Sequence, residues 1–180
     1  TASAITYGQT LASSTVTAGG FTNLAGAPVM LASAGFVSPT IAPNAGTTNV
    51  LVYCVPVNTV NYNSVTNTMS VTVNAKGLTI TANNTNKVYG DTIVFAGTEF
   101  TSVGLTNADS VSSVTLSSAG AVNTAGVNSY VINGTNAVGS GLGNYAISYV
   151  PANLTVNGKG LTITANNTNK VYGDTIVFAG

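Results

Sequence analysis

The 180-residue chain has no histidine, no arginine, no tryptophan and a single cysteine. Charged residues make up only 4% of it, and four lysines balance four acids, so the formal net charge is zero. Without histidine, the usual metal clusters and the Ser-His-Asp and Cys-His catalytic arrangements cannot be assembled. We therefore expect no catalytic residues, no metal site, no cofactor and no enzymatic activity. A chain without net charge also lacks the basic surface that binds nucleic acid.

Long apolar runs are missing as well. The longest is Val50 to Val57, eight residues, whereas a membrane-spanning helix needs about 20. We therefore expect no membrane span in this segment. Cys54 lies inside this run and is predicted to be a buried, unreactive thiol. An intermolecular disulfide is the alternative, and it requires an exposed Cys54.

The residues that are present favour β-structure. Threonine, valine, asparagine, serine and 20 glycines dominate, and strong helix formers are scarce. Apolar and polar residues alternate in several short segments, as in half-buried strands: 50–57, 69–73, 78–81, 111–116, 130–132, 145–149 and 154–156. About seven short strands per repeat, separated by polar turns, predict an all-β fold of tandem Ig-like β-sandwich domains in an extended rod.

The sequence also repeats itself. Residues 77–97 and 160–180 are identical, GLTITANNTNKVYGDTIVFAG, at an offset of 83 residues. A diverged copy opens the chain, and Ala45-Gly46 in it is matched to Ala125-Gly126. We expect residues 1–76 to be a repeat lacking its first strand, 77–159 a complete repeat, and 160–180 the start of a further identical repeat. The strands on either side of each junction are close in sequence, which predicts a short connection.

Two sets of residues are candidates for a structural role. The first is the set that recurs between copies: Tyr7, Gly8, Tyr89, Gly90, Tyr172, Gly173, Tyr62 and Tyr145. Here we expect the tyrosine to pack and the glycine to adopt a turn conformation; an exposed aromatic ligand platform is the alternative. The second set marks a possible strand between repeats or subunits: Leu78, Ile80, Leu161 and Ile163. An internal Lys–Asn crosslink near Lys87 and Glu99 is a further alternative.

These motifs, taken in order, resemble a known family. The Tyr-Gly-x-Thr opening, the Asn144-Tyr145 pair and the junction from Leu154 to Ile163 are similar to MBG (mostly beta, glycine-rich) domains of the YGX type. The first repeat is also similar to bacterial Ig-like repeats. The resemblance implies an Ig-like β fold in large bacterial surface adhesins, including filamentous-haemagglutinin-like ones. It implies no catalytic residues.

The expected function is that of a structural repeat region in a secreted or cell-surface bacterial adhesin, biofilm component or extracellular filament. It would supply length and mechanical strength, with residues 78–81 paired to residues 154–156. Strand exchange between subunits is a further expectation, so the expected partners are neighbouring copies of the chain. The alternative is a glycan- or surface-binding Ig-like module that contacts host-surface or matrix glycans through loops at residues 133–144.

Overall fold

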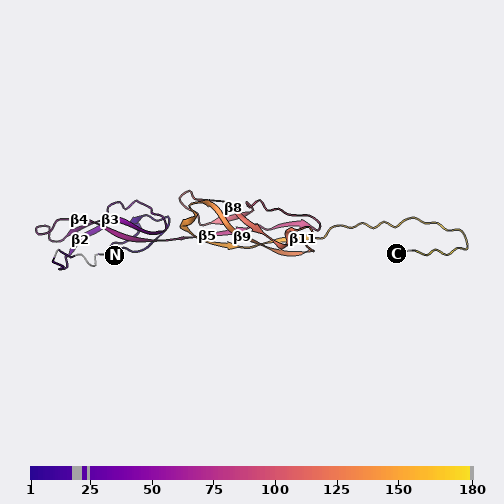
Figure 1. The fold of residues 1–180 in the computed structure, drawn as a ribbon, viewed down its shortest axis with the longest axis horizontal. Coiled ribbons are helices and arrows are strands. Elements are labelled where there is room, and N and C mark those ends of the chain that lie inside the picture. The colour runs from indigo at the N-terminus through magenta and orange to yellow at the C-terminus, as the bar shows by residue number, and fades with distance from the viewer. Residues whose placement is uncertain (18–21, 24, 179–180) are drawn as a thin grey trace.

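The structure, a computed structural model, describes residues 1–17, 22–23 and 25–178. The last two residues of the expected segment 160–180 lie outside this range. The described residues form β-strands and short 3-10 turns, without any α-helix, so the prediction of a mainly β chain is confirmed. Figure 1 shows two strand-bearing parts that follow one another along the long axis, and then an extended segment. We call them the N-terminal unit (1–74), the C-terminal unit (76–157) and the tail (158–178).

The N-terminal unit contains one mixed sheet with strand order β1-β4-β3-β2. Its strands are β1 (Ile5–Thr6), β2 (Leu31–Phe36), β3 (Gly46–Pro56) and β4 (Val65–Asn74). β4 pairs antiparallel with β3 along most of its length, whereas β1 pairs with it in parallel only at Val73 and Asn74. The edge of β4 opposite β3 therefore has no partner strand from Val65 to Thr72 among the described residues.

The C-terminal unit contains seven strands in two sheets, with orders β10-β5-β7 and β6-β11-β9-β8. The strands are β5 (Lys76–Ala82), β6 (Thr85–Val88), β7 (Phe100–Val103), β8 (Ser110–Ser117), β9 (Asn128–Ser140), β10 (Tyr145–Val150) and β11 (Ala152–Asn157). Ala82 of the first sheet packs against Ile132 and Leu154 of the second, so the two sheets face each other across a shared core.

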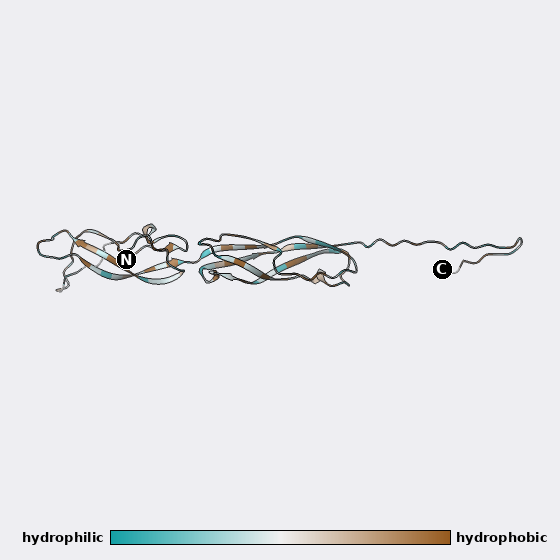
Figure 2. Cartoon of the chain, turned by 90° about the horizontal axis from the view of Figure 1, so that it is seen from above, coloured by the Kyte–Doolittle hydropathy of each residue, from teal (hydrophilic) through white to brown (hydrophobic). Residues whose placement is uncertain are grey.

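Alternation of apolar and polar residues builds this core. Along β5, Leu78 and Ile80 are 0% and 1% exposed, while the alternating Thr79 and Thr81 are only partly buried. Figure 2 shows the same alternation of hydrophobic and hydrophilic residues along the strands of both units. β-branched side chains fit such a half-buried pleated surface, which explains why a chain rich in threonine and valine forms these sheets.

The two units share one pattern at their ends. In the N-terminal unit Ile5 pairs with Val73 in parallel, and in the C-terminal unit Lys87 pairs with Val156 in parallel. β1 and β6 are therefore equivalent strands, each paired to the last strand of its own unit. Only Ala75 separates β4 from β5, so the connection between the units is short.

The expected pairing of residues 78–81 with residues 154–156 is wrong. β5 pairs in parallel with β10, from Tyr145 to Val150, and β11 pairs in parallel with β6. After Ala82 the chain passes from β5 in the first sheet to β6 in the second sheet. At Pro151 the chain passes again across the core, from β10 in the first sheet to β11 in the second. Proline has no N–H group with which to continue the hydrogen bonding of β10.

Two further expectations are corrected by the strand register. Residues 133–140 lie in β9 rather than in a loop, and only the short turn from Gly141 to Asn144 connects β9 to β10. Gly46 pairs with Val73 as Asn128 pairs with Val156, so Gly46 corresponds to Asn128 and not to Gly126.

The described part of the tail forms no strand. Leu161 and Ile163 are 83% and 85% exposed, although their sequence surroundings are identical to those of the buried Leu78 and Ile80. Burial of these side chains is therefore a property of the completed unit and not of the local sequence.

Leu78 and Leu161 have the same sequence neighbours but differ in burial, so they provide a matched pair of substitutions. We expect Leu78→Ala to lower the free energy of unfolding by about 2–5 kcal/mol, because it leaves a cavity in the core. Leu161→Ala should change it by less than about 0.5 kcal/mol, the usual range for surface substitutions. Denaturant unfolding followed by circular dichroism measures both. Equal effects of the two substitutions would contradict the core described above.

Candidate functional site: the contact between the units

The Tyr-Gly motif forms the same tight turn in all three copies. The N–H of Gln9 donates to the carbonyl of Thr6 at 3.0 Å, and Gly8 between them has φ +92°. Asp91 and Asp174 close the corresponding turns at 3.1 and 3.2 Å, with glycine φ values of +96° and +93°. A positive φ at the second central residue is the signature of turns that require glycine. The turn forms even in the tail, so it is encoded locally.

In each unit this turn lies beside the end of the last strand. The N–H of Tyr7 donates to the carbonyl of Asn74 at 2.9 Å, and the N–H of Tyr89 donates to that of Asn157 at 2.8 Å. Both tyrosines are thus fixed by the backbone at the end of their unit from which the chain leaves.

The side chain of Tyr7 reaches into the C-terminal unit. Its hydroxyl donates to Oδ2 of Asp109 at 2.9 Å, and the hydroxyl of Tyr145 donates to the same oxygen at 2.8 Å. The two rings meet edge to face, with centroids 5.4 Å apart and planes at 80°. We call these three residues the Tyr–Asp contact. It combines charge-assisted hydrogen bonds with a favourable aromatic geometry.

A strained turn presents Asp109. Its N–H donates to the carbonyl of Thr106 at 3.0 Å, and the two central residues, Asn107 and Ala108, have φ values of +56° and +61°. Asparagine tolerates this region, whereas alanine pays a cost there. The N–H of Thr106 also donates to the hydroxyl of Tyr145 at 2.9 Å. The turn therefore positions the Asp109 carboxylate and also hydrogen-bonds the hydroxyl of Tyr145.

A glycine on the neighbouring turn makes room for this carboxylate. Gly141 has φ +71°, and a Cβ atom there would lie 2.0 Å from Oδ1 of Asp109. The turn from Gly141 to Asn144 also contacts the other unit, because the N–H of Ala45 donates to Oδ1 of Asn144 at 2.9 Å. Two turns of the C-terminal unit thus hold two segments of the N-terminal unit.

Only some of the candidate residues named from the sequence meet here. Tyr7 and Tyr145 are 6% and 7% exposed, and Gly8 approaches Thr106 so closely that an added Cβ would lie 3.0 Å from its methyl group. Tyr62, Tyr89 and Tyr172 are 38%, 46% and 103% exposed and lie elsewhere. Gly90 follows Tyr89, and Gly173 follows Tyr172. Leu78 and Ile80 lie in β5, whereas Leu161 and Ile163 lie in the tail.

Sequence reasoning named Asn144 only as part of the recurring Asn-Tyr pair, and it did not assign Thr106, Asp109 or Gly141 to a contact between units. One signal was available, because Asp109 is one of only four acids in the chain. Its partners come from positions about 35 and 100 residues away, and no local pattern records such a contact.

Burial raises the pKa of Tyr145 above its ordinary value of 10.0, and the hydrogen bond from this hydroxyl to the Asp109 carboxylate raises it further. The protonated hydroxyl is a donor that the carboxylate needs, so ionisation of Tyr145 would place two negative charges side by side. The Tyr–Asp contact therefore stabilises the protonated form of Tyr145.

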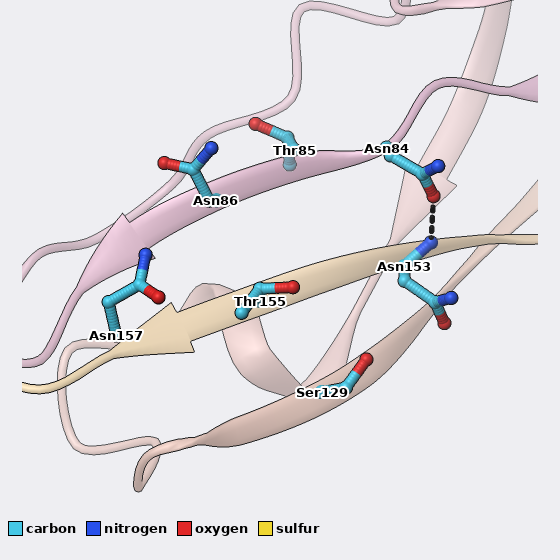
Figure 3. A pocket seen from close by; sticks show the side chains of 7 residues that line it. All are labelled: Asn84, Thr85, Asn86, Ser129, Asn153, Thr155 and Asn157. Carbon is cyan, nitrogen blue, oxygen red and sulfur yellow. Dashed lines mark hydrogen bonds between the residues drawn. The ribbon is translucent and has the colours of Figure 1, made fainter.

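A shallow polar groove crosses β6, β11 and the start of β9 (Figure 3). It is lined by Asn84, Thr85, Asn86, Ser129, Asn153, Thr155 and Asn157. One hydrogen bond crosses it, from the N–H of Asn153 to Oδ1 of Asn84 at 2.8 Å. Every lining side chain carries a neutral amide or hydroxyl group, and such groups can hydrogen-bond the hydroxyls of a glycan.

Lys87 and Glu99 have separate partners. Lys87 is 5% exposed, and its ammonium donates to the backbone carbonyls of Asp91 and Val122. The carboxylate of Glu99 accepts from the N–H groups of residues 96, 97 and 98 at 2.8–3.0 Å. The pKa of Glu99 is lowered, first of all by the bond from Ala96. Glu99 thus stabilises its own loop, whereas Lys87 links β6 to the segment that contains Val122.

Cys54 is 2% exposed, in the core of the N-terminal unit. Burial raises the pKa of its thiol, which disfavours the reactive thiolate. Within residues 1–17, 22–23 and 25–178, no group of three or more His, Cys, Asp and Glu side chains is placed to hold a metal ion. None of the described helical segments is long and apolar enough to span a bilayer.

Comparison with known proteins identifies one relationship. Residues 78–155 match the family model described as MBG domain (YGX type), so the resemblance noted in the sequence is confirmed for the C-terminal unit. Domains of this family are non-catalytic repeat modules and are typical of bacterial surface proteins. No curated protein matches the chain.

The raised pKa of Tyr145 predicts how stability depends on pH. Its contribution is fully present below pH 10.0, the ordinary value for the unfolded chain, and is lost as the pH rises through the folded-state pKa. The difference in unfolding free energy between the wild type and Tyr145→Phe should therefore shrink above that pH. Denaturant unfolding across the alkaline range measures it.

The control is Tyr172→Phe in the tail, where the ring has no contact to lose on unfolding. It should leave the alkaline stability profile unchanged. If Tyr145→Phe gives the same profile as this control, the hydroxyl of Tyr145 does not stabilise the contact as described.

Proposed function

We propose that this chain is a load-bearing repeat segment of a secreted or surface-exposed bacterial protein. Ig-like β-sandwich repeats would follow one another as a rod and give length and mechanical strength to an adhesin or extracellular filament. The membership of residues 78–155 in a family of surface-protein repeat modules supports this class. The strand pairing of the C-terminal unit supports the mechanical role.

The observation that carries the proposal is that the opening strands of the unit pair in parallel with its closing strands. β5 pairs with β10 over six residue pairs, and β6 pairs with β11 over four. The chain enters through β5 and leaves through β11. A force applied along the chain therefore acts on strands that point in the same direction.

Parallel strands pulled from opposite ends slide past each other. All of their hydrogen bonds then carry the load together, whereas peeling apart the two adjacent ends of a hairpin loads the bonds one at a time. The evenly spaced bonds of a parallel ladder suit the first geometry. Because β5 and β6 lie in different sheets, both sheets must shear before the unit opens.

Single-molecule pulling of the full chain through its two ends tests this proposal. Unfolding of residues 76–157 should add roughly 28 nm of contour, at about 3.4 Å per residue, less the folded length. The unfolding force should be high, because two parallel ladders must break at once. A gradual extension without a distinct step would contradict the load-bearing role.

The matched control changes only the direction of pulling. Handles attached at Ser110→Cys and Ser140→Cys act on directly paired residues of β8 and β9 and therefore peel this hairpin from one end. Cys54 is buried and does not compete for the handles. The mean unfolding force should be lower in this direction, and equal forces would show that the parallel pairs bear no special load.

The same proposal includes assembly of chains by strand exchange. Residues 160–165 repeat residues 77–82 of β5 but pair with no strand among the described residues, and β4 has an open edge there from Val65 to Thr72. An unpaired strand and an open edge are the two components of β-augmentation. The tail of one copy would add in parallel beside β4 of the next.

Strand exchange is tested by the mass of the full chain in solution as its concentration rises. We expect oligomers for the wild type and monomers for Leu161→Asn combined with Ile163→Asn. Val177→Asn combined with Phe178→Asn is the control, because these side chains are 86% and 80% exposed but lie outside residues 160–165. Equal assembly of both variants, or a monomeric wild type, would refute the exchange.

A further inference from the structure

Tyr89 occupies in the C-terminal unit the place that Tyr7 occupies in the N-terminal unit. Both follow a strand paired in parallel to the last strand, and both donate a backbone hydrogen bond to the asparagine that ends it. Their exposure differs, however: Tyr7 is 6% exposed and Tyr89 is 46% exposed. Tyr7 is covered by Asp109 and Tyr145 of the unit that follows, and Tyr89 has no such cover among the described residues.

The sequence after the C-terminal unit indicates what covers Tyr89. Residues 160–178 repeat residues 77–95, with which the C-terminal unit begins. We call the end of this unit that contacts Tyr7, formed by the turns at 106–109 and 141–145, its front end. The spacing also matches: Val73 and Leu78 are as far apart in sequence as Val156 and Leu161. A repeat beginning at residue 160 would therefore follow β11 after the same number of residues as the repeat beginning at residue 77 follows β4.

We propose that Tyr89 is one half of a docking surface for the front end of a second copy of residues 77–157. Its hydroxyl donates to the copy's counterpart of Asp109, beside the counterpart of Tyr145. This inference rests on the proposed function as a repeat array. It adds that consecutive repeats are fixed to each other, because the tyrosine of the Tyr-Gly motif in one repeat binds the aspartate of the next.

The rest of this end of the unit fits the same partner. Strand register places Val127 where Ala45 lies in the N-terminal unit, and the N–H of Ala45 bonds Asn144 across the contact. Val127 is 64% exposed, and Val88 and Val122 are 39% and 53% exposed. The surface therefore offers an apolar rim near the tyrosine and places the backbone of Val127 at the position of the Ala45 donor.

The docking surface also selects its partner. The first acid in the sequence is Asp91, so residues 1–76 contain no carboxylate. A repeat of the N-terminal type has Tyr62 at the position of Tyr145, but it has no aspartate to accept the two hydroxyl protons. Tyr89 therefore discriminates in favour of repeats that carry the Asp109 turn.

The test extends the full chain beyond Gly180 with a second copy of residues 98–159, which completes the repeat begun at residue 160. Spin labels are attached at Ser117→Cys, on the exposed edge strand β8, and at the same position of the added copy. Pulsed electron paramagnetic resonance then gives the distribution of distances between the two units. We expect one narrow distribution.

Tyr89→Ala should broaden this distribution to the width seen when Tyr7→Ala releases the first contact, measured with labels on the first two units. Tyr89→Phe, which keeps the ring, and Asp→Asn at the counterpart of Asp109 should each broaden it partly. Tyr62→Ala removes an exposed tyrosine elsewhere and should leave it unchanged. A broad distribution before any substitution, or one that Tyr89→Ala leaves unchanged, overturns the inference.

The unfolding force of each variant separates this inference from the proposed function. A high force with no effect of Tyr89→Ala on the distances refutes the docking surface and leaves the load-bearing role intact. A low force with distances that do depend on Tyr89 refutes the load-bearing role and supports the docking surface.

Discussion

The parallel pairing of the first strands of a unit with its last strands is the constraint on which the rest of the structure depends. It requires the chain to enter at one end and leave at the other, so that units follow one another along an axis instead of folding back (Figure 1). It also places the Tyr-Gly turn beside the strand that leads into the next unit. The contact between units is thus a consequence of the pairing within each unit.

The scarcity of charge gives the few charged groups well-defined structural roles. Asp109 accepts two tyrosine hydroxyls at the contact between units, Glu99 accepts three backbone N–H groups, and Lys87 donates to two backbone carbonyls. Across the described part of the chain, no buried side-chain nitrogen or oxygen lacks a hydrogen-bond partner. Surface ion pairs contribute little to stability and weaken in salt. The contacts of Asp109, Glu99 and Lys87 do not depend on surface ion pairs, so we expect them to be little affected by ionic strength.

Strands whose faces alternate could be predicted from the sequence, because burial on one side imposes a period of two residues. That signal located at least half of each of β3, β4, β5, β8, β10 and β11, and a short part of β9. It missed β6, where the buried residue is a lysine, Lys87, whose ammonium donates to the backbone carbonyls of Asp91 and Val122, and it missed β1, β2 and β7. The pairing of β5 with β10 and the meeting of Tyr7, Asp109 and Tyr145 depend on residues that come together only after folding. Identical copies showed which residues recur, but only the strand register showed that Gly46 corresponds to Asn128.

The parallel pairing also sets the order in which a unit is completed during synthesis. β5 and β6 emerge first, and their partners β10 and β11 are the last strands of the same unit. Contacts between the two ends of a segment raise its contact order and slow its folding. A unit synthesised from its N-terminus stays open until its final residues have been added. Only the Tyr-Gly turn, which forms locally even in the tail, is in place beforehand. Until that closure, Leu78 and Ile80 stay exposed to solvent, as Leu161 and Ile163 are in the tail.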